Sequence, residues 1–221
     1  MNVIPATILD GFLDNPNTIR DWGKSLEFNL DPTNRWPGKR TLALNLLHPS
    51  LFNYINIKVL SLFFENPIGY QSEIFFQSIE GFQDKGWVHQ DSTLFTFIIY
   101  LSKEDEINCG TTLYSLKKNK LHSINSDQDN LILDKRYHHH QTKSISSETQ
   151  ILKSRYEDSN FDETLNVKDK YNRLFCFSGE NFHSANFLSN NTTPRLTLIG
   201  FVNKIYASNP PVIRSKQTLM M

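Results

Sequence analysis

The stretch GWVHQDSTLFTFIIYLS, residues 86–102, decides the fold that we predict for this chain. Its second half is almost continuously apolar and rich in aromatic and β-branched side chains, which predicts a strand covered on both faces. His89 and Asp91 stand two residues apart at the start of that run. Because residues i and i+2 of a strand project to the same side, one imidazole and one carboxylate are expected side by side on one face of a sheet.

A second histidine and an arginine follow in later β-rich stretches. His183 lies in NRLFCFSGENFHSANF, residues 172–187, and Arg195 opens the run RLTLIGFV. Together with His89 and Asp91, His183 completes two imidazoles and one carboxylate, the donor set of the facial triad that binds non-heme Fe(II). Such a set leaves coordination positions open for a bidentate cosubstrate and O2.

A cosubstrate with a distal carboxylate needs a cation at the far end of its pocket. Arg195 suits this role, because the planar guanidinium binds a carboxylate through two hydrogen bonds and stays protonated. Tyr100, at the end of the first strand, is the candidate for a second hydrogen bond to that carboxylate.

Composition indicates one intracellular domain. The 221 residues fit a single domain, residues 1–221, and 16 phenylalanines can fill a β-rich core. Basic and acidic residues both number 23, so no overall field attracts nucleic acid or an anionic membrane. The two cysteines form no CxxC pair, and the N-terminus MNVIPATILDGF lacks the pattern of a signal peptide. The apolar runs are too short to span a bilayer, so we expect a soluble cytoplasmic protein.

The coarse pattern predicts a mainly β chain with helices near its N-terminus. A strand over 3–13, a helix beginning at Pro16 and a buried helix beginning at Pro49 make up the N-terminal strand and supporting helices, residues 1–69. The later strands are expected over residues 72–80, 95–102, 111–116, 172–179 and 195–202.

Two polar segments interrupt this pattern. DPTNRWPGKRT, residues 31–41, is either a solvated turn or a loop at the mouth of a pocket. Residues 117–170 carry ten basic and nine acidic side chains with few apolar clusters, which predicts a long polar insertion or lid over the iron mouth.

These motifs together resemble the 2-oxoglutarate/Fe(II)-dependent dioxygenases, in particular their prolyl-hydroxylase-like branch. HQD resembles the HxD box of that family, and NRLFCFSGENFHSAN resembles the segment with its distal histidine. The resemblance implies His89, Asp91 and His183 as catalytic iron ligands. It covers roughly residues 70–203. A weaker similarity, through WPGKRT, extends to small uncharacterised oxygenases of bacteria and their viruses.

The resemblance also implies a cosubstrate pocket and a fold. TFIIYLS resembles the strand with the cosubstrate-binding tyrosine, here Tyr100, and PRLTLIGF the closing strand with the 2-oxoglutarate-binding arginine, here Arg195. Thr197 has the same strand parity and is a further candidate. Ile79 stands where the family often has another tyrosine. The implied fold is a double-stranded β-helix, the jelly-roll or cupin-like core, with flanking helices.

The activity that the resemblance implies is that of a hydroxylase with Fe(II), 2-oxoglutarate and O2, giving succinate and CO2 as coproducts. A peptidyl or protein side chain is the first substrate class by analogy with the branch, and a small molecule the second. Trp87 and Arg40 are the candidate substrate contacts, although aromatic packing or a surface charge explains each equally simply.

Two other hypotheses stay open. A non-catalytic cupin-like binding module would keep the barrel without iron chemistry, and a cupin dioxygenase would need extra histidines near the first box. The consecutive His138, His139 and His140 do not favour a metal site, because neighbouring strand residues point to opposite faces.

Overall fold

A large antiparallel sheet and a small one form the framework of the protein. The computed structural model describes residues 6–31, 36, 38–65, 67–79, 88–103, 109–117, 160–186 and 194–207. In chain order the elements are β1 (Thr7–Asp10), α1 (Pro16–Lys24), β2 (Asn29–Leu30), β3 (Lys39–Arg40), α2 (Leu44–Leu47), α3 (Pro49–Leu60), β4 (Pro67–Ile79), β5 (Phe95–Tyr100), β6 (Gly110–Leu116), β7 (Phe161–Lys168), β8 (Arg173–Ser178), β9 (Phe182–Ala185) and β10 (Arg195–Ala207).

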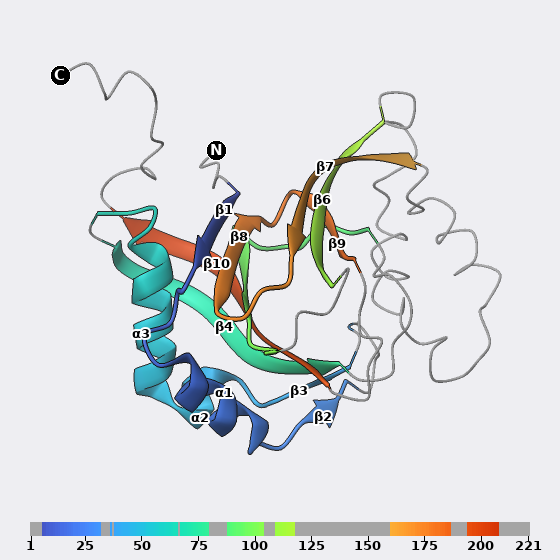
Figure 1. Cartoon of the computed structure of the whole chain (residues 1–221). Coiled ribbons are helices and arrows are strands. Elements are labelled where there is room, and N and C mark those ends of the chain that lie inside the picture. The colour runs from blue at the N-terminus through green and yellow to red at the C-terminus, as the bar shows by residue number, and fades with distance from the viewer. Residues whose placement is uncertain are drawn as a thin grey trace.

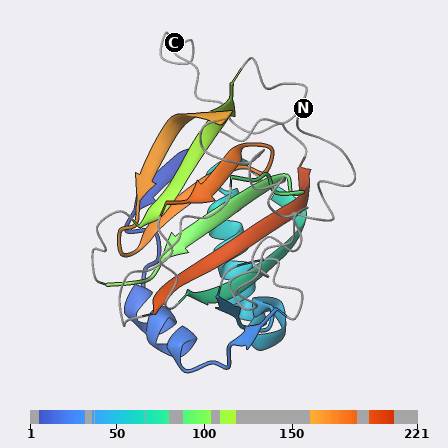
Figure 2. The same cartoon turned by 90° about the vertical axis from the view of Figure 1, so that its right-hand side faces the viewer.

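The strand order identifies the fold. The large sheet runs β1-β8-β5-β10-β4-β3-β2 and the small one β7-β6-β9, so the chain crosses between the sheets after β5, β7, β8 and β9. Figures 1 and 2 show the small sheet on one side of the large sheet and the helices on the other. This is the predicted mainly β, double-stranded β-helix architecture, which the structure confirms.

Alternate residues of the long strand β10 face opposite sides of the large sheet. Leu196, Leu198 and Val202 face outward and belong to the main core, which includes residues of α2 and α3. The alternate residues of β10 face the small sheet, because successive strand residues point to opposite sides. Between the sheets a second core contains Tyr100 and Phe177, together with residues of the small sheet.

The two predicted helices, α1 and α3, begin where the sequence indicated, whereas the short α2 was not predicted. α1 starts at Pro16 and α3 at Pro49, and the side chain of His48 accepts a hydrogen bond from Leu51 N at 3.2 Å, which caps α3. Ile55 and Val59 of α3 are fully buried against the outer face of the large sheet. Among the residues described, no helix has the length and apolar character needed to cross a membrane.

Two strands lie in segments that were predicted to be irregular. Residues 161–168 of the expected polar insertion form β7, whose mostly exposed burial pattern explains its weak strand signal. The preceding residues 118–159, including the three consecutive histidines, lie outside the described part of the chain. Within the expected loop 31–41, β3 pairs with β2 and β4.

Candidate metal centre

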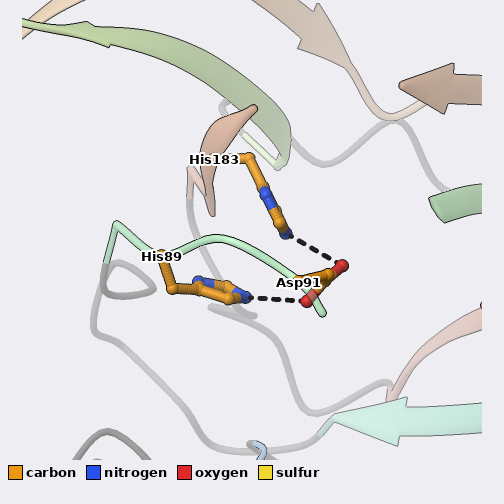
Figure 3. Close-up of side chains that lie close together, drawn as sticks. All are labelled: His89, Asp91 and His183. Atoms are coloured by element: carbon orange, nitrogen blue, oxygen red, sulfur yellow. Dashed lines mark ion pairs between the residues drawn. The ribbon is translucent and has the colours of Figure 1, made fainter. Parts of the chain in front are cut away.

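His89, Asp91 and His183 come together at one end of the space between the sheets (Figure 3). The backbones of His89 and His183 exchange two hydrogen bonds, with N···O distances of 2.9 and 2.8 Å. Asp91 N donates to Gly179 O at 2.9 Å, in the turn that joins β8 to β9. The predicted triad is therefore assembled by pairing of the HxD segment with the strand of the distal histidine.

The side chains converge through their metal-binding atoms. Nε2 of His89 lies 3.7 Å from Oδ1 of Asp91, and Nε2 of His183 lies 3.5 Å from Oδ2. Ligand atoms at about 2.1 Å from one ion lie up to roughly 4.2 Å apart, so both carboxylate–imidazole distances fall within this range, and all three ligand atoms lie within 4.8 Å of one another before any ion draws them in. Two imidazoles and one carboxylate at these separations fit Fe(II), with positions left open for other ligands.

Polar neighbours orient two of the three side chains. Nδ1 of His183 lies 2.9 Å from the carbonyl oxygen of Asn181, so Nδ1 carries the proton and Nε2 keeps its lone pair for a metal. The hydroxyl of Thr96 donates to Oδ2 of Asp91 at 2.5 Å, and Thr93 Oγ1 lies 3.2 Å from Thr96 Oγ1.

Arg195 and Tyr100 lie together between the sheets, on the same inner face as Thr96. The guanidinium carbon of Arg195 is 5.5 Å from the centroid of the Tyr100 ring. Thr197 pairs directly with Tyr100 and points the same way. Tyr100 and Thr96 are four residues apart on β5, so their side chains share a face. The candidate cosubstrate residues thus lie on the face that also contacts the triad.

Charge and burial set the protonation states of Tyr100 and Arg195. Burial is the main cause that raises the pKa of Tyr100 to about 12, so its hydroxyl stays protonated at neutral pH. That hydroxyl lies 2.9 Å from Thr111 Oγ1. Burial alone would lower the pKa of Arg195, but the carboxylate of Asp169 raises it overall, with Nε of Arg195 donating to Oδ2 at 3.2 Å.

Two of the remaining candidates, Ile79 and Arg40, lie on strands next to this site. Ile79 is paired with Arg195 and buried, so an apolar side chain neighbours the guanidinium there. Arg40 faces the same side from β3, and Trp87 lies outside the described residues. Sequence reasoning missed Thr96 and Asp169; strand parity with Tyr100 could have indicated Thr96, whereas no local signal pointed to Asp169.

Known structures share this arrangement of sheets. HygX from Streptomyces hygroscopicus with iron bound matches with a TM-score of 0.53 and 10% identity, over 90% of this chain and 82% of that chain. HygX with nickel and 2-oxoglutarate bound matches with a TM-score of 0.51 and 11% identity, over 90% and 83% of the two chains. A Pseudomonas putida prolyl-4-hydroxylase covers 90% of this chain and 92% of its own, with 12% identity and a TM-score of 0.48.

The chain shares the double-stranded β-helix fold of these HygX structures, and it brings His89, Asp91 and His183 together as a candidate metal site. Residues 2–202 match the sequence profile described as "Family of unknown function (DUF6445)". The chain belongs to that family. A search of curated proteins found no match.

Proposed function

We propose that this protein is a 2-oxoglutarate- and Fe(II)-dependent oxygenase that hydroxylates a peptidyl side chain or a small molecule. The observation that carries the proposal is the His89, Asp91 and His183 cluster, which has metal-binding atoms within 4.8 Å of one another. The HygX structures have the same fold, one with iron bound and one with nickel and 2-oxoglutarate bound. They support a metal ion and 2-oxoglutarate as the ligands of this site.

Each group has a defined task in this proposal. His89, Asp91 and His183 hold the iron, which with 2-oxoglutarate and O2 supplies the oxidising power for hydroxylation, with succinate and CO2 as coproducts. Arg195 binds the distal carboxylate of 2-oxoglutarate, and the protonated Tyr100 donates a hydrogen bond to it. Thr197 lies beside Tyr100 and contributes a further hydroxyl to the same pocket.

The wall between the two ends of the site is apolar. Ile98, Ile199 and Phe175 lie in one row across β5, β10 and β8, on the face shared by Thr96 and Tyr100. There they would line the carbon chain of a bound 2-oxoglutarate and would keep water from the space beside the metal. Hydroxylation requires that water be excluded, because water would otherwise compete with the substrate for the space beside the metal.

Anaerobic titration of Fe(II) and 2-oxoglutarate into the protein tests the proposal. We expect the weak visible charge-transfer band of an iron-chelated 2-oxo acid in the wild type. The His89→Ala variant loses the band, Arg195→Ala needs far more 2-oxoglutarate to form it, and a control variant at the helix cap, His48→Ala, keeps it. A folded wild-type protein without the band would favour the non-catalytic binding module instead.

A further inference from the structure

We infer that Arg40 binds a carboxylate group of the substrate, so that the oxidised molecule is an acid. This inference rests on the proposed function and adds the chemical class of the substrate. Arg40 is a half-buried residue of β3, in the segment where the sequence allowed either a solvated turn or the mouth of a pocket.

Strand register places Arg40 on the inner face of the large sheet (β3 and β4 in Figure 1). Arg40 pairs with Gln77, Gln77 pairs with Thr197, and Thr197 pairs with Tyr100. Directly paired residues project to the same side, so these four side chains form one row across β3, β4, β10 and β5. With strands about 4.8 Å apart, the Cα atoms of Arg40 and Thr197 are separated by about 10 Å.

Gly38 brings β3 against β4. It has a φ of +74°, and a Cβ at this position would lie 2.3 Å from the carbonyl oxygen of Ser78 and 2.9 Å from a side-chain carbon of Ile79. A side chain here would therefore force the two strands apart. The glycine of WPGKR thus fixes the position from which Arg40 enters the space between the sheets.

Aromatic rings hold the guanidinium of Arg40. Its central carbon lies 4.2 Å from the ring centroid of Trp36, 5.3 Å from that of Phe201 and 5.7 Å from that of Phe75. Nη2 of Arg40 donates a hydrogen bond to Oε1 of Gln77 at 3.3 Å. The aromatic faces reduce the hydration of the cation, and its rigid, planar fork lies among them in a fixed orientation.

This environment suits a carboxylate more than other partners. A guanidinium has five N–H donors in a rigid fork that matches the two oxygens of a carboxylate, and a half-buried cation gains more from that pair than an exposed one. Phe201 is paired with Thr96, which contacts Asp91, so one edge of this aromatic cluster adjoins the triad. A substrate anchored at Arg40 can therefore extend along Phe201 toward the metal.

Nuclear magnetic resonance of the intact chain, labelled with ¹⁵N-arginine and loaded with Zn(II) and 2-oxoglutarate, tests the inference. The Arg40 Nε–H signal is assigned by its loss in Arg40→Gln. We expect benzoate to shift that signal saturably and the uncharged analogue benzamide to leave it unmoved. In calorimetric titrations, Arg40→Gln weakens benzoate binding roughly tenfold or more, as expected on loss of a charge-assisted contact.

Lys39 supplies the matched control. It is the neighbouring residue on β3, exposed and on the opposite face, so Lys39→Gln removes the same charge without touching the inner row. Benzoate binding should survive in Lys39→Gln and weaken in Arg40→Lys, which keeps the charge but lacks the fork. An Arg40 signal that benzoate does not move, or that benzamide moves equally, overturns the inference.

Two further ligands identify where the carboxylate comes from. L-Leucine carries the carboxylate of a free amino acid, and N-acetyl-L-glutamate N-methylamide carries that of a peptide side chain. The ligand that binds more tightly shows whether the substrate carboxylate belongs to a free amino acid or to a peptide side chain. Failure of the chain to bind Zn(II) and 2-oxoglutarate would instead count against the proposed function, since the loading step measures that separately.

Discussion

The hydroxyl of Thr96 donates a 2.5 Å hydrogen bond to Oδ2 of Asp91, the carboxylate of the candidate triad. Thr96 is buried on β5, and the contact joins the large sheet to the HxD segment. Because a carboxylate oxygen that accepts this bond has one lone pair engaged, Thr96 fixes the rotation of the Asp91 side chain. Thr96 is therefore a positioning residue, and its role can be separated from that of the ligands.

Replacing Thr96 with valine should weaken metal binding while leaving the fold intact. Thr96→Val keeps the side-chain shape and removes the hydroxyl, and loss of such a partner typically costs about 10- to 100-fold in metal affinity. Competition with a chelator for Zn(II) measures the change. Thr164→Val, which removes a hydroxyl that donates to Leu113 O on the small sheet, is the control and should bind Zn(II) as the wild type does. Equal affinity in Thr96→Val would show that Asp91 is held by other contacts.

Replacing Asp169 with asparagine should destabilise the protein and should make its stability depend more strongly on bound 2-oxoglutarate. The side chains of Arg195 and Asp169 are only 5% and 4% exposed, so the variant leaves a buried cation without its charge partner. Breaking a buried pair in this way costs about 3–5 kcal/mol of unfolding free energy. Since the distal carboxylate of 2-oxoglutarate can replace the lost charge, the ligand should raise the melting temperature more in Asp169→Asn than in the wild type. Denaturation with and without 2-oxoglutarate measures both effects, and an equal ligand-induced shift in the two proteins would argue against binding at Arg195.

The ion pairs of Asp10 on β1 with Arg173 on β8 and with Lys170 should weaken in acid. Hydrogen bonds from Arg173 and Lys170 hold the pKa of Asp10 well below its usual range. Because the folded pKa is depressed, the stabilisation is fully present above the unfolded pKa of about 3.9 and is lost as the pH falls through the folded value. Urea unfolding from pH 6 downward should therefore show a steeper loss in the wild type than in Asp10→Asn. Identical pH profiles below about pH 4 would contradict this assignment.

Gly200 should tolerate no side chain. It pairs with Phe97, and a Cβ at Gly200 would lie 2.0 Å from the ring of Phe97 in the main core. Gly200→Ala should lower the unfolding free energy by about 1–3 kcal/mol through overpacking. Gly69→Ala is the control on the paired strand, because its Cβ would meet Tyr206 at an ordinary 3.5 Å. Chemical denaturation should show a clearly lower unfolding free energy for Gly200→Ala than for Gly69→Ala.

Local pattern was sufficient to predict much of the fold and the triad. His89 and Asp91 come together with His183 as predicted, although they precede β5 and only His89 makes an isolated bridge, and the two predicted helices begin at Pro16 and Pro49. Strand β7 was missed because FDETLNVK exposes most of its side chains, so it lacks the apolar alternation that marks a strand. Trp87 and residues 118–159 lie outside the described part of the chain, so the predicted substrate contact and lid stay predictions.

The sequence by itself indicated the candidate residues: two histidines and a carboxylate in or beside β-rich runs, and an arginine that opens the last strand. Only the tertiary structure decided which partners those residues meet. Thr96 reaches Asp91, Asp169 reaches Arg195, and Arg40 joins the inner row through Gln77. The physical reason is that side-chain parity is a local property of a strand, whereas the neighbour across a sheet depends on the register of strands that are far apart in the chain.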